Sequence, residues 1–278
     1  MYKDKKVGVV IPAYNEERLV GRVIETLPSF VDCIIVVDDA SQDRTKEIVN
    51  SYLPQLEGRL ILICHEQNQG VGGAIVSGHY RALAEGMDVI AVMAGDAQMD
   101  PAELNRVLEP VVEGQADYAK GNRFASGEAW QAMPKIRFFA NAALSMLNKI
   151  ASGYWHVADP QCGYTAISRY ALERLDLDRI SKGYQFENSM LTHLNLYDLR
   201  VIDVPVKPLY GIGEKSGFSN WWALGAFSVY LVYTFVGRLW AKYVIRDFHP
   251  LVLFYFFGFL FLLFGLILGI YFSSFDKN

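Results

Sequence analysis

Acidic and amide side chains alternate in the stretch VMAGDAQMDP, which covers residues 92–101. An apolar, strand-like run ends in a glycine turn, and Asp96, Gln98 and Asp100 follow at every second position. Hard oxygen ligands of this kind suit Mg²⁺ or Mn²⁺, which keep several waters and bind substrate phosphates. A solvated turn is the simpler interpretation, with Asp100 capping a helix and Pro101 at its first position. Both interpretations place the stretch at the end of a strand.

Four apolar runs rich in β-branched residues predict buried strands, and amphipathic segments separate them. The strands are expected at residues 7–12, 33–39, 59–64 and 89–93, and helices at 16–28, 41–53 and 71–86. This alternation predicts an α/β fold with a mostly parallel sheet and right-handed crossovers. Ligands of such sheets bind beyond the carboxyl ends of the strands. The rule selects four loops, at residues 12–17, 38–44, 66–73 and 95–101.

Composition bounds the partners and the location of the chain. The net charge of -4 argues against nucleic acid, which requires a basic surface. Residues 250–275 contain no charged residue and exceed the roughly 20 apolar residues that cross a bilayer. The apolar run near the N-terminus is too short for a signal-peptide core. We therefore expect a cell-membrane protein whose residues 1–215 lie in the cytoplasm.

A segment rich in Trp and Tyr, residues 216–249, precedes the expected span. Arg238, Lys242 and Arg246 follow each other at steps of four, on one face of a helix. The favoured interpretation is an amphipathic juxtamembrane helix with this basic stripe against anionic lipid. The alternative is a second span that forms a hairpin with the last helix.

The strand-end loops are informative as a set. They carry VVIPAYNEE, VVDDASQDRT, NQGVGGA and AGDAQMDP in chain order. Further motifs follow, namely GNRF (121–124), MPKIRFFAN (133–141), DPQCGYTAISR (159–169), GYQFE (183–187) and VPVKPLYGIGEKS (204–216). Over nearly all of residues 5–215, the chain resembles family 2 glycosyltransferases with the GT-A nucleotide-sugar fold. Within that family it looks most like polyprenyl-phosphate glycosyltransferases related to dolichyl-phosphate mannose synthases.

The resemblance implies a Rossmann-like GT-A catalytic domain at residues 1–215 that binds a nucleotide-diphosphate sugar, of the GDP-mannose or UDP-glucose type. The implied donor-binding residues are Pro12, Tyr14, Glu16, Asp39, Gly70, Asp96 and Lys215. Glu16 and Asp39 match positions that bind the base and the ribose, and Lys215 would close over the diphosphate.

A divalent cation is expected at the end of the fourth strand. The leaving diphosphate develops charge that Mg²⁺ or Mn²⁺ would neutralise. Asp96 and Gln98, two apart on an extended loop, can converge on one ion, which leaves Asp100 as the helix cap. Ala94 replaces the first acid of the family's pattern.

The acceptor side is expected to use arginine, whose planar fork suits phosphate oxygens. In the resembled family, arginines at the positions of Arg123 and Arg137 hold the lipid phosphate; a surface salt bridge is the alternative for each. Asp159 stands where many glycosyltransferases keep a catalytic base. Because a lipid monophosphate is already ionised, we expect Asp159 to orient the acceptor or the sugar. Glu187 either binds sugar hydroxyls or is a buried structural carboxylate.

The favoured function is an inverting transfer of one hexose to a polyprenyl phosphate, dolichyl or undecaprenyl, at the cytoplasmic membrane face, by a possible homo-oligomer. One alternative is another membrane-bound family 2 enzyme of cell-surface polysaccharide synthesis. Processive members of that kind carry a QxxRW motif, whereas Gln185 here is followed by Phe-Glu-Asn. The other is a non-catalytic nucleotide-sugar-binding scaffold, which only Ala94 favours.

Overall fold

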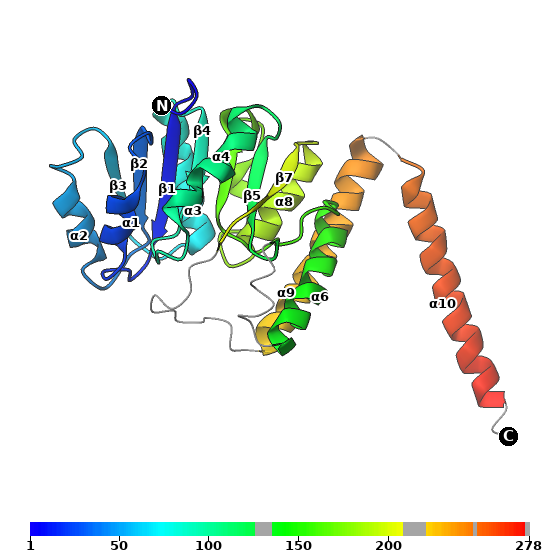
Figure 1. Ribbon diagram of the computed structural model, residues 1–278. Helices are drawn as coiled ribbons and strands as arrows, with labels where there is room; N and C mark the ends of the chain where they lie inside the picture. The colour runs from blue at the N-terminus through cyan, green and yellow to red at the C-terminus, as the bar shows by residue number, and fades with distance from the viewer. Residues whose placement is uncertain (126–134, 208–220, 247–248, 276–278) are drawn as a thin grey trace.

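A seven-stranded sheet forms the centre of the protein in the computed structural model, which describes residues 1–125, 135–207, 221–246 and 249–275 (Figure 1). The strands are β1 (Val7–Ala13), β2 (Cys33–Asp38), β3 (Leu60–Cys64), β4 (Val89–Val92), β5 (Tyr118–Asn122), β6 (Thr165–Ser168) and β7 (Val201–Pro205). Their order is β3-β2-β1-β4-β6-β5-β7. Only β6 runs antiparallel to its neighbours in this sheet, so the expected mostly parallel α/β fold is confirmed.

Helices cover both faces of the sheet, which explains why the central strands are continuously apolar. The helices of this part are α1 (Val20–Thr26), α2 (Thr45–Tyr52), α3 (Val71–Ala84), α4 (Leu104–Val112), α6 (Lys135–Ser152), α7 (Arg169–Leu172) and α8 (Phe186–Leu196), with short 3₁₀ turns η1 (Pro101–Glu103) and η2 (Leu177–Arg179). Ile34 belongs to the apolar core on one face together with residues of α1, α2 and α4, and its neighbour Ile35 belongs to the core on the other face with residues of α3 and α8. The Asp100 side chain accepts from the Ala102 amide at 2.9 Å, which confirms the predicted helix cap.

Three helical segments complete the chain: α9 (Trp221–Arg238), the π-helix η3 (Leu239–Arg246) and α10 (Leu251–Phe275). Leu231 of α9 packs between Leu144 and Ala151 of α6, and the two helices lie side by side (Figure 1). In the described part of the chain, Leu251–Phe272 is the one helix long and apolar enough to cross a membrane, and none of it is buried.

Arg238 faces the protein rather than solvent. Its Nε donates to the carbonyl of Ala151 at 2.8 Å and its Nη2 to the carbonyl of Ile150 at 3.0 Å. These carbonyls belong to the last turn of α6, where a helix lacks internal donors and its dipole favours a cation. With only 6% of its surface exposed, Arg238 joins α9 to α6.

Lys242 and Arg246 make the corresponding contacts at the end of α8. The Lys242 ammonium donates to the carbonyl of Asn195 at 2.8 Å, and both cations pair with Asp198. The prediction that the stripe of Arg238, Lys242 and Arg246 lies against anionic lipid is therefore wrong. In the structure these cations are bound by carbonyls at two helix ends and by one carboxylate.

Candidate active site

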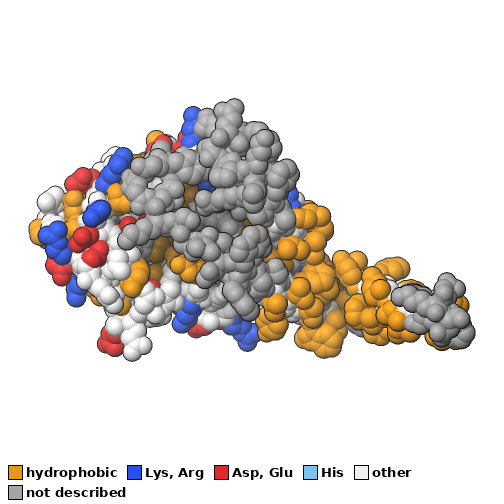
Figure 2. Space-filling view, turned by 90° about the horizontal axis from the view of Figure 1, so that it is seen from below, with side chains coloured by type: hydrophobic (Ala, Val, Ile, Leu, Met, Phe, Trp, Pro, Cys, Tyr) orange, Lys and Arg blue, Asp and Glu red, His pale blue; other side chains and the backbone are white. Residues whose placement is uncertain are grey.

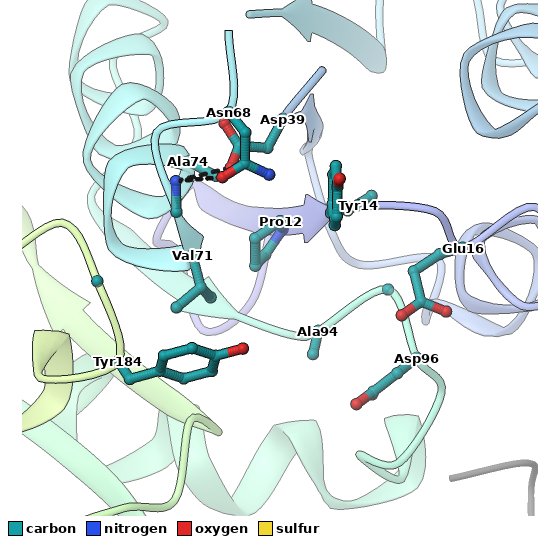
Figure 3. Close-up of a pocket in the computed structure, with 14 residues that line it drawn as sticks. Pro12, Tyr14, Glu16, Asp39, Asn68, Val71, Ala74, Ala94, Asp96 and Tyr184 are labelled. Atoms are coloured by element: carbon teal, nitrogen blue, oxygen red, sulfur yellow. Dashed lines mark hydrogen bonds between the residues drawn. The ribbon is translucent and has the colours of Figure 1, made fainter. Parts of the chain in front are cut away.

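A pocket of about 610 Å³ opens at the carboxyl ends of the central strands (Figure 3). This volume lies in the range of small-molecule sites. Six of the predicted donor-binding residues line it, namely Pro12, Tyr14, Glu16, Asp39, Gly70 and Asp96. Lys215 lies outside the described residues. The loops selected by the strand-end rule thus meet around one cavity.

The loop after β1 is held by the loop after β2. Asn15 adopts a positive φ of 57°, its amide donates to the Ser41 hydroxyl at 3.0 Å, and its side chain accepts from the Gln42 amide at 2.8 Å. This pairing fixes the turn from which Tyr14 and Glu16 reach the pocket wall (Figure 3).

Asp39 is 3% exposed and is engaged by its own chain. Its carboxylate accepts from the amides of Gln69 and Gly70, each at 2.8 Å. His65 bridges Asp39 and Ser77, with ring nitrogens 2.7 Å and 2.9 Å from their oxygens. A nucleoside would therefore meet an Asp39 that is already oriented. No spacing in the sequence pointed to His65. This residue follows β3 and contacts Asp39, which follows the neighbouring strand β2.

The glycines after β3 allow a close approach of two backbone segments, and the second segment is the loop before α8. A Cβ on Gly70, where φ is +85°, would lie 2.6 Å from the Lys182 carbonyl oxygen, and one on Gly72 would lie 2.5 Å from that of Ser181. The Gly73 amide donates to the same Lys182 carbonyl at 3.2 Å. The start of α3 therefore fixes this loop.

The loop after β4 turns at Ala97, so the expectation of an extended loop is wrong, while the metal assignment of Asp96 and Gln98 stays a prediction. The Gln98 amide donates to the Asp96 carboxylate at 3.1 Å, around Ala97 with a φ of 57°. Asp96 lines the pocket, whereas Gln98 is half-buried and does not.

The donor set at this loop is compatible with a divalent cation that keeps much of its water. Within the described ranges, no three His, Cys, Asp or Glu residues gather into a group that could hold a metal. One pocket-lining carboxylate beside an amide residue fits Mg²⁺ or Mn²⁺, whose remaining ligands are substrate phosphates and water. Asp96 is thus the central candidate ligand, with Gln98 beside it.

Arg123 follows β5 and forms a forked ion pair with Asp159. Its Nε lies 2.7 Å and its Nη2 3.0 Å from the two carboxylate oxygens, and its amide donates at 3.2 Å. Asp159 is 1% exposed, whereas the Arg123 side chain is 35% exposed. The expected direct contact of Asp159 with acceptor or sugar does not fit this burial; Asp159 orients Arg123 instead.

The second predicted acceptor arginine, Arg137, lies on the first turn of α6, and its side chain is outside the described residues. β5 runs parallel to β4 and stands two strands from it, so Arg123 leaves the same sheet edge about 10 Å from the strand that carries Asp96.

Lys120 is a site residue that the sequence interpretation missed. It is fully buried on β5, and its ammonium donates to the carbonyl of Cys162 in the Asp159 turn. Burial lowers the pKa of Lys120, against the opposing effect of the Glu187 and Asp159 carboxylates. Burial likewise raises the pKa of Glu187, against the attraction of Lys120. Glu187 is half-buried and lies near enough to Lys120 for each charge to favour the ionised form of the other.

The model of glycosyl transferase family 2 matches residues 8–176. The chain belongs to this family. This family-2 chain is 32% identical, over 219 residues, to the UDP-N-acetylglucosamine–dolichyl-phosphate N-acetylglucosaminyltransferase of Methanococcus voltae, covering 74% of the chain and 87% of the relative. It is 30% identical to the polyprenol monophosphomannose synthase of Mycolicibacterium smegmatis, covering 75% and 80%.

The structural neighbours of this glycosyltransferase confirm the GT-A fold. Glucosyl-3-phosphoglycerate synthase from Mycobacterium tuberculosis, in complex with Mn²⁺, uridine diphosphate and phosphoglyceric acid, superposes with a TM-score of 0.60 at 20% identity. The match covers 84% of the present chain and 78% of that structure. At this identity the likeness concerns the fold alone.

Proposed function

We propose that this glycosyltransferase moves one hexose or N-acetylhexosamine, with inversion, from a nucleoside-diphosphate sugar to a polyprenyl phosphate. The observation that carries the proposal is a donor-sized pocket beside a carboxylate-oriented arginine at the same edge of the sheet. The two relatives support it, because their names join a nucleotide sugar with dolichyl phosphate and a mannose phosphate with a polyprenol.

On the donor side, Asp39 would meet the nucleoside and Asp96 the diphosphate, with Glu16 between the two loops (Figure 3). Asp96 and Gln98 would hold Mg²⁺ or Mn²⁺. When bound, that ion supplies the positive charge that stabilises a leaving diphosphate. Lys215 would add a further positive charge to the same group.

On the acceptor side, Arg123 and Arg137 would hold the lipid phosphate, and Asp159 fixes the direction of the Arg123 fork. A phosphate oxygen attacks the anomeric carbon from the side opposite the diphosphate. One carbon–oxygen bond forms to the acceptor while the bond to the diphosphate breaks, which inverts the anomeric centre. A general base is unnecessary, because a phosphate monoester with a second pKa of about 6 is already ionised at neutral pH.

The exposed face of α9 and η3 supports placement at a membrane surface. Val229, Val232, Tyr233, Val236 and Trp240 are all more than half exposed and recur at helical spacing, so they form one apolar stripe. Figure 2 shows hydrophobic side chains along α10 and on the adjoining part of the body. We infer that the stripe rests in the interface while α10 crosses the bilayer.

The basic residues on the N-terminal side of α10 support a cytoplasmic catalytic domain. Arg238, Lys242 and Arg246 all precede the span closely, and positively charged flanks favour the cytoplasmic side of a membrane.

The direct test supplies purified full-length protein with polyprenyl phosphate and a panel of UDP- and GDP-sugars, and reads lipid-linked product by mass. The expected product carries a single sugar, and the anomeric configuration is inverted relative to the donor. Repeated addition of sugars would instead support a polysaccharide synthase. Nucleotide-sugar binding without any transfer would support the non-catalytic scaffold.

A further inference from the structure

Tyr184 combines high exposure with a place in the donor pocket. Its side chain is 82% exposed, yet it lines the cavity together with Pro12, Val71 and Ala94. Figure 3 shows the ring directed into the pocket, with the phenol oxygen on the side of Ala94. An aromatic ring left in water at the mouth of a ligand cavity offers an apolar face and a polar tip to whatever enters.

The loop that carries Tyr184 is fixed at both ends. On one side the Lys182 carbonyl accepts from the Gly73 amide at 3.2 Å, at the glycine-rich start of α3. On the other, the Phe186 amide donates to the Gly183 carbonyl at 3.0 Å, at the start of α8. The tyrosine ring therefore projects from an anchored backbone, which lowers the entropy lost when a ligand contacts it.

The position of the ring within the pocket indicates which part of the donor it meets. Asp39 lies at the end opposite Tyr184, with Pro12 and Val71 between them (Figure 3). Asp96 stands at the end of β4, beyond Ala94. A donor with its nucleoside at Asp39 and its diphosphate at Asp96 brings its sugar to the side of Ala94, where the methyl side chain leaves room.

We propose that Tyr184 binds the transferred sugar of the donor, with the ring face against the C–H groups of the pyranose and the phenol toward one of its hydroxyls. This proposal rests on the proposed donor site. It makes Tyr184 a specificity-determining residue for the sugar rather than for the nucleotide.

The test measures donor binding by calorimetry on full-length protein in detergent with Mg²⁺ and without acceptor. The probes are UDP with UDP-N-acetylglucosamine and GDP with GDP-mannose. For the pair that the wild-type protein binds, Tyr184→Ala should weaken sugar-nucleotide binding roughly tenfold and nucleoside-diphosphate binding less than about twofold. Tyr184→Phe should retain most of the affinity, because it keeps the ring. Tyr197→Ala removes another exposed tyrosine, at the far end of α8, and serves as the matched control.

An equal loss for nucleotide and sugar nucleotide would overturn the proposal and place the ring on the base. Unchanged binding of both would also overturn it. Because the measurement contains no acceptor, it is separable from the proposed function: a wild-type protein that binds the sugar nucleotide but transfers nothing to polyprenyl phosphate refutes the transfer alone.

Discussion

Asp159 accepts three hydrogen bonds from Arg123 while nearly excluded from water, so the protein alone fixes the direction of the guanidinium. Such preorganisation reduces the ordering cost of binding an anion. The Lys120 ammonium donates to the carbonyl of Cys162, which belongs to the same turn as Asp159. Arg123 and Asp159 were both predicted from motifs, and the turn that carries Asp159 is held by Lys120, which lies in none of the quoted motifs.

The contribution of Arg123 to acceptor binding is testable by truncation. Arg123→Ala should lower kcat/KM for polyprenyl phosphate roughly tenfold or more, because a charge-assisted contact is worth about 1.5–3 kcal/mol. Donor affinity should change less than twofold. Initial rates over a range of acceptor concentrations at saturating donor measure the effect. Arg179→Ala, which removes an arginine from an exposed pair with Asp176, is the matched control.

Arg123→Ala also leaves the Asp159 charge buried and unpaired, which destabilises the fold by itself. The double variant Arg123→Ala, Asp159→Ala removes both charges and separates the two effects. Recovery of acceptor use in the double variant would show that the arginine serves folding and does not bind phosphate.

Metal dependence tests Asp96. EDTA should abolish transfer and added Mg²⁺ or Mn²⁺ should restore it, because the leaving diphosphate needs a neutralising cation. Asp96→Ala should lose nearly all activity at any metal concentration, whereas Asp100→Ala, which removes the helix cap on the same loop, should lose only stability. Product formation is measured by mass. Full activity of Asp96→Ala in chelator would remove Asp96 from the site.

At the scale of elements, the sequence was sufficient to predict the positions of the central strands but not the conformations of the loops that follow them. The runs at β1 to β4 are apolar and β-branched, and both properties act locally, so their positions were predictable. The contact of Gly72 with Ser181 joins segments more than a hundred residues apart, and the local pattern contains no trace of it. The turn at Ala97 depends on one side-chain acceptor, and the stripe from Arg238 to Arg246 depends on partners at the ends of α6 and α8.

Helix α3 contains a histidine that should make the fold sensitive to acid. His79 is 1% exposed, and burial lowers its pKa from 6.5 to about 4. Below pH 6.5 His79 becomes protonated in the unfolded chain but stays neutral in the folded chain. The free energy of unfolding therefore falls as the pH drops toward 4. The expected loss at pH 5 is about 2 kcal/mol from this residue.

Substitution His79→Leu removes the titrating group and keeps an apolar helix face. The variant should lose about 2 kcal/mol less than the wild-type protein between pH 7 and pH 5. Urea unfolding at the two pH values measures the difference. Parallel losses in the two proteins would show that His79 is protonated in the folded state.

At the scale of the whole molecule, the charged side chains of α9 and η3 contact the protein and an apolar stripe faces outward. The cations of α9 and η3 bind the ends of α6 and α8, so the apolar stripe of α9 and η3 faces outward. This segment directly precedes α10. Because α6 also carries Arg137, α9 packs against the helix of a predicted acceptor residue. Sequence periodicity identified the basic face of this segment but assigned it to the wrong partner.

Deletion of residues 250–278 tests this arrangement, since no part of the helix Leu251–Phe272 is buried against the rest of the protein. The truncated protein should bind nucleotide sugar normally and use a short, water-soluble polyprenyl phosphate. Its transfer to long-chain lipid in liposomes should fall by about tenfold or more, because the anchor no longer raises the local concentration of enzyme at the lipid.

Within that truncated protein, Val232→Glu and Trp240→Glu should each weaken flotation with vesicles, since a carboxylate in the apolar stripe cannot enter the interface without losing hydration. Tyr80→Glu places the same charge on the exposed side of α3, away from the stripe, and should leave flotation unchanged. Lys242→Glu should instead loosen η3 from Asp198 and increase protease cleavage between α9 and α10. If Lys242→Glu abolished flotation while Val232→Glu and Trp240→Glu did not, the basic residues would be the lipid contact and the apolar stripe would face another part of the protein.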